Sequence, residues 1–399
     1  MTTAMAVTSC FAFLPALAQA QISDDKIRIG LITDMSGVYS DISGQGHVEA
    51  IRMAIEDFGG QLDGKKIELL VSDHLNKPDI AAAKAREWVD QEGVDVLMSG
   101  ASSAADLAIA QIANEKKKVF FVIATGTSRL TNEDCNPYTI HYGYDTVAMA
   151  KATGSAVVKQ GGKSWAFLTA DYAFGHSLQA DTTRIIEAGG GQVVGAVRHP
   201  LGATDFSSFI VQVQSSGAQI LGLANATADT INSIKAANDF GVTQSMKLAG
   251  LVMFVTDIHA VGLDMTQGMY LSDNWYWDQN DESRQWSRRY FDKLKKMPTG
   301  NQAAGYSATM LYLKSVQAAG TDVADPVMRV MKDSTINDMF VKNATVRADG
   351  RVMYDMHLMQ VKTPGESKYP WDYAKQVERV AAVDAFTTPE ESRCSLLKR

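Results

Sequence analysis

The sequence predicts an α/β fold with two doubly wound, parallel-sheet lobes that are joined by a three-strand hinge. Three observations lead to this prediction. Short apolar runs, expected as strands, alternate with amphipathic stretches, expected as helices. This alternation starts again after residue 144, which indicates two lobes. Parts of the last third of the chain are assigned to each lobe. Helices between consecutive strands give right-handed crossovers and a parallel sheet that is covered on both faces.

The expected organisation has four parts. Residues 1–20 form an export signal, residues 21–142 with 275–350 form lobe 1, residues 143–274 with 351–385 form lobe 2, and residues 386–399 form a C-terminal tail. The chain would cross between the lobes near Tyr142, Asp273 and Arg351. Short crossings of this kind act as a hinge, so we expect the lobes to open and close over a cleft.

In lobe 1, strands are expected at 26–32, 65–73, 94–98 and 119–124, with helices at 46–58, 78–91 and 104–113. In lobe 2, strands are expected at 164–168, 192–198, 219–224 and 247–254, with helices at 176–187, 206–214 and 230–240. The later helices at 281–296, 306–319 and 326–332 are assigned to lobe 1, and a strand pair at 351–362 and 373–382 to lobe 2.

Composition and motifs argue against several functions. A formal net charge of −7 does not suit a nucleic-acid surface. The sequence Gly44-Gln45-Gly46 lacks the third glycine of the dinucleotide fingerprint, and there is no Gly-x-Ser-x-Gly elbow. The seven histidines show no metal-ligand spacing. We therefore expect no enzyme activity, no catalytic residues, no metal and no cofactor.

The first twenty residues indicate export. They carry no charge, contain an apolar run, and end in Ala18-Gln19-Ala20, which is typical of a signal-peptidase site. Cleavage after Ala20 would deliver the protein to the periplasm, and the run is too short to span a membrane. Cys10 precedes the apolar run, so the segment is a poor lipoprotein signal. The remaining cysteines, Cys135 and Cys394, are predicted to form a disulfide, as an even pair in an exported chain suggests.

Small hydroxyl-rich loops follow two consecutive strands and are the strongest sign of a binding site. Ser102 and Ser103 follow the strand that ends near residue 98, and Thr125 and Thr127 follow the next strand. In an open parallel sheet such ends lie on one edge, where hydroxyls and N–H groups can bind a carboxylate. The alternative is that these hydroxyls only cap helices.

Several features of the sequence together resemble one known family. They are the exported start, the segment Gly30-Leu31-Ile32-Thr33-Asp34-Met35-Ser36-Gly37, Ser102 and Ser103, the motif Asp171-Tyr172-Ala173-Phe174-Gly175, and the order of the elements. The family is the branched-chain amino acid type of periplasmic substrate-binding protein. These are the type I, Venus-flytrap receptors of ABC transporters. The resemblance implies that the protein delivers a small ligand to an ABC transporter permease. We expect a monomer that does not itself span the membrane.

The resemblance also assigns roles to residues. Ser102 and Ser103 correspond to the carboxylate-binding serine loop, with Thr125 and Thr127 in the second loop and Tyr39 on the same side. Phe174 takes the place of an aromatic lid residue, beside Tyr172, and Asn225 follows the next strand of lobe 2. The remaining expected ligand contacts are Met253 and Trp275.

Amino-acid binders of this type usually carry an acidic residue for the ligand ammonium after the strand that ends near Met253, but this loop is apolar here. An unpaired ammonium in a closed cleft is costly. The sequence therefore favours an organic, keto or aromatic acid as ligand. The alternatives are an amino acid or amide whose ammonium partner is Asp229 or Asp257, or a ligand-binding subunit of a sensory system.

Overall fold

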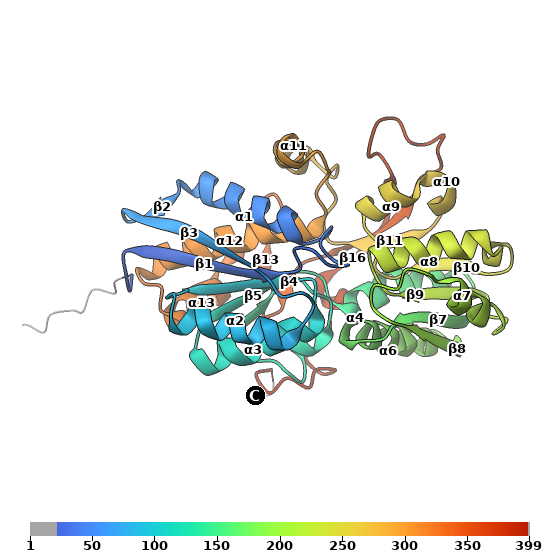
Figure 1. Ribbon diagram of the computed structural model, residues 1–399, viewed down its shortest axis with the longest axis horizontal. Coiled ribbons are helices and arrows are strands. Elements are labelled where there is room, and N and C mark those ends of the chain that lie inside the picture. Colours follow the sequence, from blue (N-terminus) through green and yellow to red (C-terminus); the bar gives the residue numbers. More distant parts are fainter. Residues whose placement is uncertain (1–21, 398–399) are drawn as a thin grey trace, which may run out of the picture.

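A six-stranded sheet forms the centre of lobe 1 in the computed structural model, which describes residues 22–397 (Figure 1). The strand order is β2-β3-β1-β4-β5-β6, and every neighbouring pair is parallel except β2 with β3. The strands are β1 (Lys26–Thr33), β2 (Gln61–Leu62), β3 (Lys65–Asp73), β4 (Val96–Gly100), β5 (Val119–Ala124) and β6 (Thr139–His141).

Helices cover both faces of this sheet, because successive side chains of a strand point to opposite faces and both sets are apolar here. In β5, Phe121 and Ile123 belong to one hydrophobic core, while Phe120 and Val122 belong to the other. The first core lies under α1 (Gly44–Phe58) and α12 (Gly300–Ala319), which pack together, and α13 (Ala324–Asp333) packs on α12. The second core lies under α2 (Pro78–Asp90) and α3 (Ser103–Lys116) (Figure 1). A short 3-10 turn, η1 (Ser128–Thr131), follows β5, and α11 (Asp281–Leu294) contacts α1.

Lobe 2 is built on a four-stranded parallel sheet of order β10-β9-β7-β8. Its strands are β7 (Ser164–Ala170), β8 (Gln192–His199), β9 (Ile220–Ala224) and β10 (Lys247–Gly250). Its helical elements are α4 (Thr146–Met149), η2 (Ala150–Gly154), α5 (Ser155–Lys159), α6 (Ala173–Ala188), α7 (Ser207–Gln214), α8 (Ala228–Asp239), η3 (Val242–Gln244), α9 (Val255–Val261) and α10 (Leu263–Thr266).

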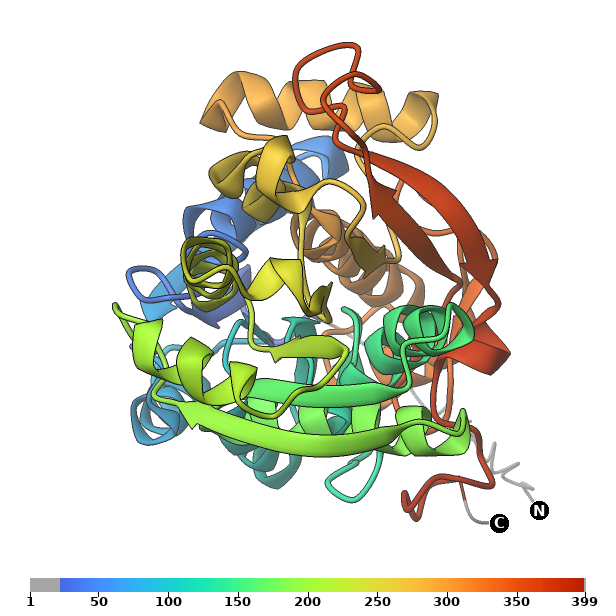
Figure 2. The ribbon, with the colours of Figure 1, turned by 90° about the vertical axis from the view of Figure 1, so that its right-hand side faces the viewer.

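Two small antiparallel sheets complete the fold. The sheet β11 (Tyr270–Asp273), β15 (Met356–Val361) and β16 (Ala374–Val380) lies against lobe 2, and β15 and β16 run along one side of the molecule (Figure 2). The other contains β12 (Thr335–Ile336), β13 (Ala344–Val346) and β14 (Val352–Met353), and β13 packs on α13. The last helix is α14 (Ala382–Ala385).

Two of the predicted crossings lie side by side, and the third, near Asp273, lies in the small sheet with β15. His141 and Arg351 form a parallel bridge, and Asp273 pairs with His357. The predicted fold class is thereby confirmed, whereas the residue boundaries of the lobes remain a prediction.

The structure corrects several local predictions. The strand expected at 351–362 is divided into β14, which pairs with β13, and β15, which pairs with β11 and β16. The strand expected at 247–254 ends at Gly250, opposite Leu223 and one residue before the end of β9, because the chain leaves the sheet there and enters the loop before α9. The helical segment 146–159 was not predicted. Residues 146–150 and 152–154 are all buried, so the segment lacks the one-sided apolar pattern that identifies a surface helix.

The predicted disulfide between Cys135 and Cys394 is present, with Cα atoms 5.7 Å apart. It joins the loop before β6 to the tail. Among residues 22–397, no helix is both long and apolar enough to cross a membrane. The predicted signal and its cleavage point after Ala20 lie outside the described residues.

Candidate functional site

The two hydroxyl-rich loops of lobe 1 are neighbours in the structure. Gly100 at the end of β4 lies opposite Ala124 at the end of β5, and the Ala101 N–H donates to the Ala124 carbonyl oxygen at 3.0 Å. Ala101 has a φ of 88°, in the left-handed region that is unfavourable for residues with a Cβ atom. Such strain is often found where a loop serves a binding site.

The hydroxyls of these loops have different roles. Ser102 caps α3 and accepts from the Ala105 N–H at 3.5 Å, as the alternative reading of the sequence expected. Ser103 Oγ is buried and has no hydrogen-bond partner within residues 22–397. Thr125 Oγ1 is also buried and makes no hydrogen bond of standard geometry in that range, although its hydroxyl lies near enough to Asp106 to affect the pKa of that carboxyl group. Because buried polar atoms are normally satisfied, these two hydroxyls are the best candidates for contact with a ligand.

Asp106 lies behind the same loops and was not predicted. It accepts a hydrogen bond from Ser99 Oγ, and its second carboxyl oxygen has no partner in the described chain. Burial raises the pKa of Asp106 to about 7, although the hydroxyls of Ser99 and Thr125 lower it. The carboxyl group can therefore be protonated near neutral pH, which reduces its repulsion of an anion held in front of it.

Lobe 2 meets this edge through polar contacts. The Tyr172 hydroxyl donates to the Tyr39 hydroxyl. Thr227 Oγ1 donates to the carbonyl oxygen of Val38 at 2.8 Å. Thr227 has a φ of 54°, so the loop after β9 also carries backbone strain. Thr127 takes part in the same boundary, with its Oγ1 3.1 Å from Ser177 Oγ.

Aromatic rings form a continuous wall over the Thr125 loop. Phe174 and Tyr144 both face Gly126, where an added Cβ atom would lie only 2.8 Å and 2.9 Å from the two rings. Phe254 lies beside Tyr144, with ring centroids 5.7 Å apart, and Tyr172 lies 6.1 Å from Phe174. Tyr144 and Phe254 were missed because single aromatic residues in a sequence are most often core residues.

The glycine of the Asp171–Gly175 motif shapes this wall. A Cβ atom at Gly175 would come 2.0 Å from the Ala170 carbonyl oxygen, so only glycine permits this turn from β7 into α6. This turn places Phe174 in the first turn of α6.

Three other expected contact residues have identified partners elsewhere in the structure, and their contact with a ligand stays a prediction. The side chain of Asn225 is occupied within lobe 2, where its oxygen accepts from Thr230 Oγ1 at 2.8 Å. Met253 is fully buried against Gly250. The Trp275 Nε1–H donates to the Met339 carbonyl oxygen at 2.9 Å, and this contact places the ring in the packing of lobe 1.

The two carboxylates considered as ammonium partners differ. Asp257 accepts from the Phe254 N–H at 2.8 Å at the start of α9. Asp229 is fully buried, accepts from the Gly202 N–H at 3.2 Å, and leaves Oδ1 without a partner in the described chain. Burial raises the pKa of Asp229 to about 6. Its charge also raises the pKa values of the Tyr39 and Tyr172 hydroxyls, after the larger effect of burial, so it lies near their contact.

No group of three or more His, Cys, Asp or Glu side chains within residues 22–397 could hold a metal ion. The arrangement contains hydroxyls, an aromatic wall and a hinge, which define the class of a two-lobed binding protein.

Comparison with known proteins identifies the family. Residues 26–367 match the periplasmic binding protein family model, so the chain belongs to this family. A periplasmic binding protein from Burkholderia mallei is 58% identical, with a TM-score of 0.92 over 94% of this chain and 100% of that chain. A branched-chain amino acid ABC transporter periplasmic ligand-binding protein from Burkholderia xenovorans is 36% identical, with a TM-score of 0.82 over the same shares.

More distant likenesses show the fold alone. A solute-binding protein of an ABC transporter from Rhodopseudomonas palustris, in complex with 3,4-dihydroxybenzoic acid, is 21% identical, with a TM-score of 0.82 over 92% of this chain and 100% of that chain. The Leu/Ile/Val-binding protein homolog 6 of Brucella suis is 24% identical, and the match spans 60% of each chain. The family is one of binding proteins, in agreement with the prediction that this chain is not an enzyme.

Proposed function

We propose that this protein captures a small carboxylate-bearing ligand between its lobes in the periplasm and delivers it to an ABC importer. The observation that supports this proposal is a pair of buried hydroxyls, Ser103 Oγ and Thr125 Oγ1, that make no hydrogen bond of standard geometry within residues 22–397. They lie at the ends of adjacent strands. Both stand at a sheet edge beside the N-terminus of α3, where a carboxylate is favoured.

The aromatic wall favours a flat or apolar ligand body. Phe174, Tyr144 and Phe254 supply apolar surface opposite the hydroxyls, and a ring or branched chain would bury against them. The Rhodopseudomonas palustris relative in complex with 3,4-dihydroxybenzoic acid is one precedent in this fold for an aromatic acid. We therefore place aromatic and keto acids first.

A thermal-shift screen of the mature protein against aromatic acids, keto acids and amino acids tests the proposal. A ligand present at 100 times its dissociation constant should stabilise the protein by about 2.7 kcal/mol, which such a screen detects. Carboxylic acids should raise the melting temperature, while the matching amides and decarboxylated compounds should not. A screen in which only compounds without a carboxylate stabilise the protein would contradict the proposal.

A second candidate function, amino-acid binding, is favoured by Asp229. Its buried Oδ1 lacks a partner in the described chain and lies near the Tyr39–Tyr172 contact, where a ligand ammonium could pair with it. Calorimetry on an amino acid and its keto analogue separates the two candidates. If the affinity for the keto acid equals or exceeds the affinity for the amino acid, the first candidate is supported. A tenfold preference for the amino acid, about 1.4 kcal/mol, supports the second. In that case Asp229→Asn should abolish the preference.

A further inference from the structure

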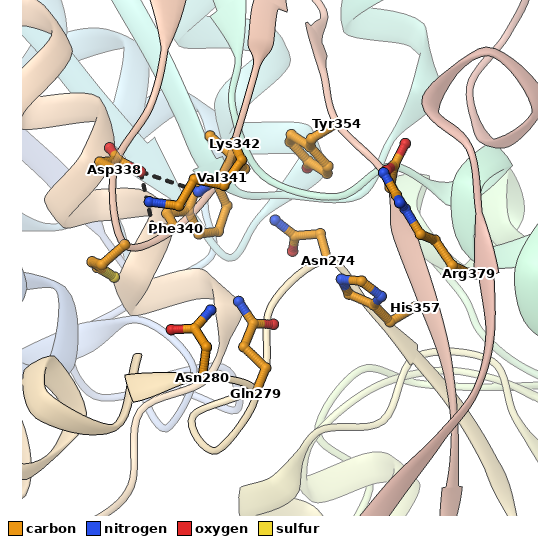
Figure 3. Close-up of a pocket in the computed structure, with 12 residues that line it drawn as sticks. Asn274, Gln279, Asn280, Asp338, Phe340, Val341, Lys342, Tyr354, His357 and Arg379 are labelled. Carbon is orange, nitrogen blue, oxygen red and sulfur yellow. Dashed lines mark hydrogen bonds and ion pairs between the residues drawn. The ribbon is translucent and has the colours of Figure 1, made fainter. Parts of the chain in front are cut away.

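A cavity of about 230 Å³ lies beside the hinge and shares no residue with the candidate site (Figure 3). One wall comes from the segment after β11, which carries Asn274, Gln279 and Asn280. A second wall is the segment 338–342, and the third comes from the strand region 354–357 and from Arg379. The cavity is therefore bordered by the small sheet that lies against lobe 2 and by the segment that packs with lobe 1.

Side-chain amides dominate the first wall. The Gln279 oxygen accepts from the Tyr276 N–H at 3.1 Å, and the Asn280 oxygen accepts from the Ser283 N–H at 2.9 Å. These bonds fix the orientation of both amides, so that their NH2 groups are the free ends. Figure 3 shows the nitrogens of both side chains pointing into the space between the walls.

Asn274 contributes a third donor. Its side chain is 5% exposed, and its Nδ2 has no hydrogen-bond partner within residues 22–397. A buried NH2 group without an acceptor is costly, so a ligand that supplies an acceptor would be favoured here. The His357 ring also lines the cavity, and its Nδ1 has no partner in the described part of the chain.

Of the charged side chains around the cavity, Arg379 and Lys342 form ion pairs with carboxylates, and Asp338 is held by hydrogen bonds from neutral donors. Arg379 Nε donates to Asp355 at 2.5 Å, and Lys342 pairs with Glu282 at 2.6 Å. Asp338 accepts from the N–H groups of Phe340 and Val341 at 2.9 and 3.1 Å and from Ser307 Oγ. The carboxylates therefore have donors, whereas the buried Asn274 NH2 group has no acceptor in the described chain, and the NH2 groups of the exposed Gln279 and Asn280 are open to solvent.

We propose that this hinge cavity binds a small oxyanion, a carboxylate or phosphate, through the NH2 groups of Asn274, Gln279 and Asn280. Three donors on one wall match the several acceptor oxygens of such an ion. An occupant would touch both the 338–342 segment and the β15–β16 pair. Such an ion would therefore bind at the hinge without entering the candidate site.

The test is a nuclear magnetic resonance titration of the ¹⁵N-labelled mature protein, followed at the side-chain NH2 signals. Sodium acetate and sodium phosphate are the two probes, at constant ionic strength with sodium chloride as reference. At least one probe should give saturating chemical-shift changes at the side-chain amides of the cavity. The dissociation constants of the two probes then show whether the cavity prefers a carboxylate or a phosphate. Shifts that do not saturate, or that chloride reproduces, would show no site and overturn the proposal.

Two charge-changing variants give the test its specificity. Gln279→Glu and Asn280→Asp keep the oxygen that accepts from Tyr276 or Ser283, but they replace the NH2 donor with a negative charge. Each should weaken binding about tenfold or more. Gln214→Glu, an exposed change of equal charge at the end of α7, should leave it unchanged. Equal affinity in all three variants would overturn the proposal, and none of these outcomes depends on the ligand of the candidate site.

Discussion

Asp229 is the residue whose environment most directly affects the candidate site. Burial raises its folded-state pKa from 3.8 to about 6, so the folded protein holds this proton more tightly than the unfolded chain does. The protonated Asp229 therefore contributes fully to the stability of the folded protein below about pH 4. This contribution is lost as the pH rises through about 6, because the buried carboxyl group then ionises.

Asp229→Asn should therefore stabilise the ligand-free protein at pH 8 relative to wild type. The gain should be roughly 1 to 3 kcal/mol and should shrink towards zero near pH 4. The asparagine oxygen can still accept from the Gly202 N–H. Urea unfolding of both proteins at several pH values measures the difference. A constant difference, or one that grows at low pH, would mean that Asp229 is not held in the protonated state by burial.

Arg351 joins the hinge crossings at a single buried side chain. Its guanidinium donates to the carbonyl oxygens of Tyr142, at 3.3 Å, and Gly143, and it lies 3.5 Å from Asp145. The ring of Phe386 lies 4.4 Å from its centre on the other side. A planar group with several donors is needed to reach all of these partners at once.

Arg351→Met should lower the free energy of unfolding by about 3 to 5 kcal/mol, because it leaves the buried Asp145 without its opposite charge. Adding Asp145→Asn should restore part of this loss. Chemical denaturation of the two single variants and the double variant gives the coupling energy. Strictly additive losses would show that the carbonyl contacts of Arg351, and not the ion pair, hold the crossings together.

The sequence predicted that two hydroxyl-rich loops lie side by side at adjacent strand ends, as the structure shows, but it could not separate the roles of the two serines. Ser102 and Ser103 are adjacent, and which of them caps α3 depends on a helix start that shifts by one residue. Trp275 shows a second limit. Its indole N–H finds its partner 64 residues away at Met339, and no local pattern predicts such a contact.

At the scale of elements, the tail connects the two lobes covalently. It leaves α14 beside α4 and η2, where Lys151 Nζ of η2 donates to the Phe386 carbonyl oxygen at 3.0 Å. Further along, Cys394 joins it to Cys135 in lobe 1. The disulfide closes a loop with a sequence separation of 259 residues.

Replacing both cysteines, Cys135→Ser with Cys394→Ser, should lower the free energy of unfolding by about 3 to 5 kcal/mol, because a long loop gains much entropy when it is opened. Urea denaturation measures the loss. Alkylation of the mature wild-type protein with and without reductant provides the control, since Cys135 and Cys394 should react only after reduction. Free thiols in the unreduced protein would contradict the bonded state.

Most strands and surface helices were predictable because each follows a local period. The alternation of apolar strands with helices along the chain, and its restart at β7, were sufficient to predict two parallel sheets. The segment 146–159 was missed because it is nearly all buried and rich in small residues. A helix that is apolar on all sides has no period to detect.

At the scale of the whole molecule, the lobes are held against each other by a few polar contacts at the mouth of the candidate site. Tyr172 bonds Tyr39, Thr227 bonds Val38, and Ser128 Oγ donates to Asp181 at 3.0 Å. The sequence predicted two lobes, but it could not give the distance between them, because this depends on contacts between residues more than 50 positions apart.

The central claim is that Ser103 and Thr125 bind the carboxylate of the ligand, and isothermal titration calorimetry with the best acid from the thermal-shift screen tests it most directly. Ser103→Ala combined with Thr125→Ala should weaken binding by about 2 to 4 kcal/mol, because two hydrogen bonds to a charged group are lost. Ser287→Ala is the matched control, since it removes another buried serine hydroxyl without a partner in the described chain, in α11. The account predicts a large loss in the double variant and wild-type affinity in the control. Unchanged affinity in a folded double variant would contradict it.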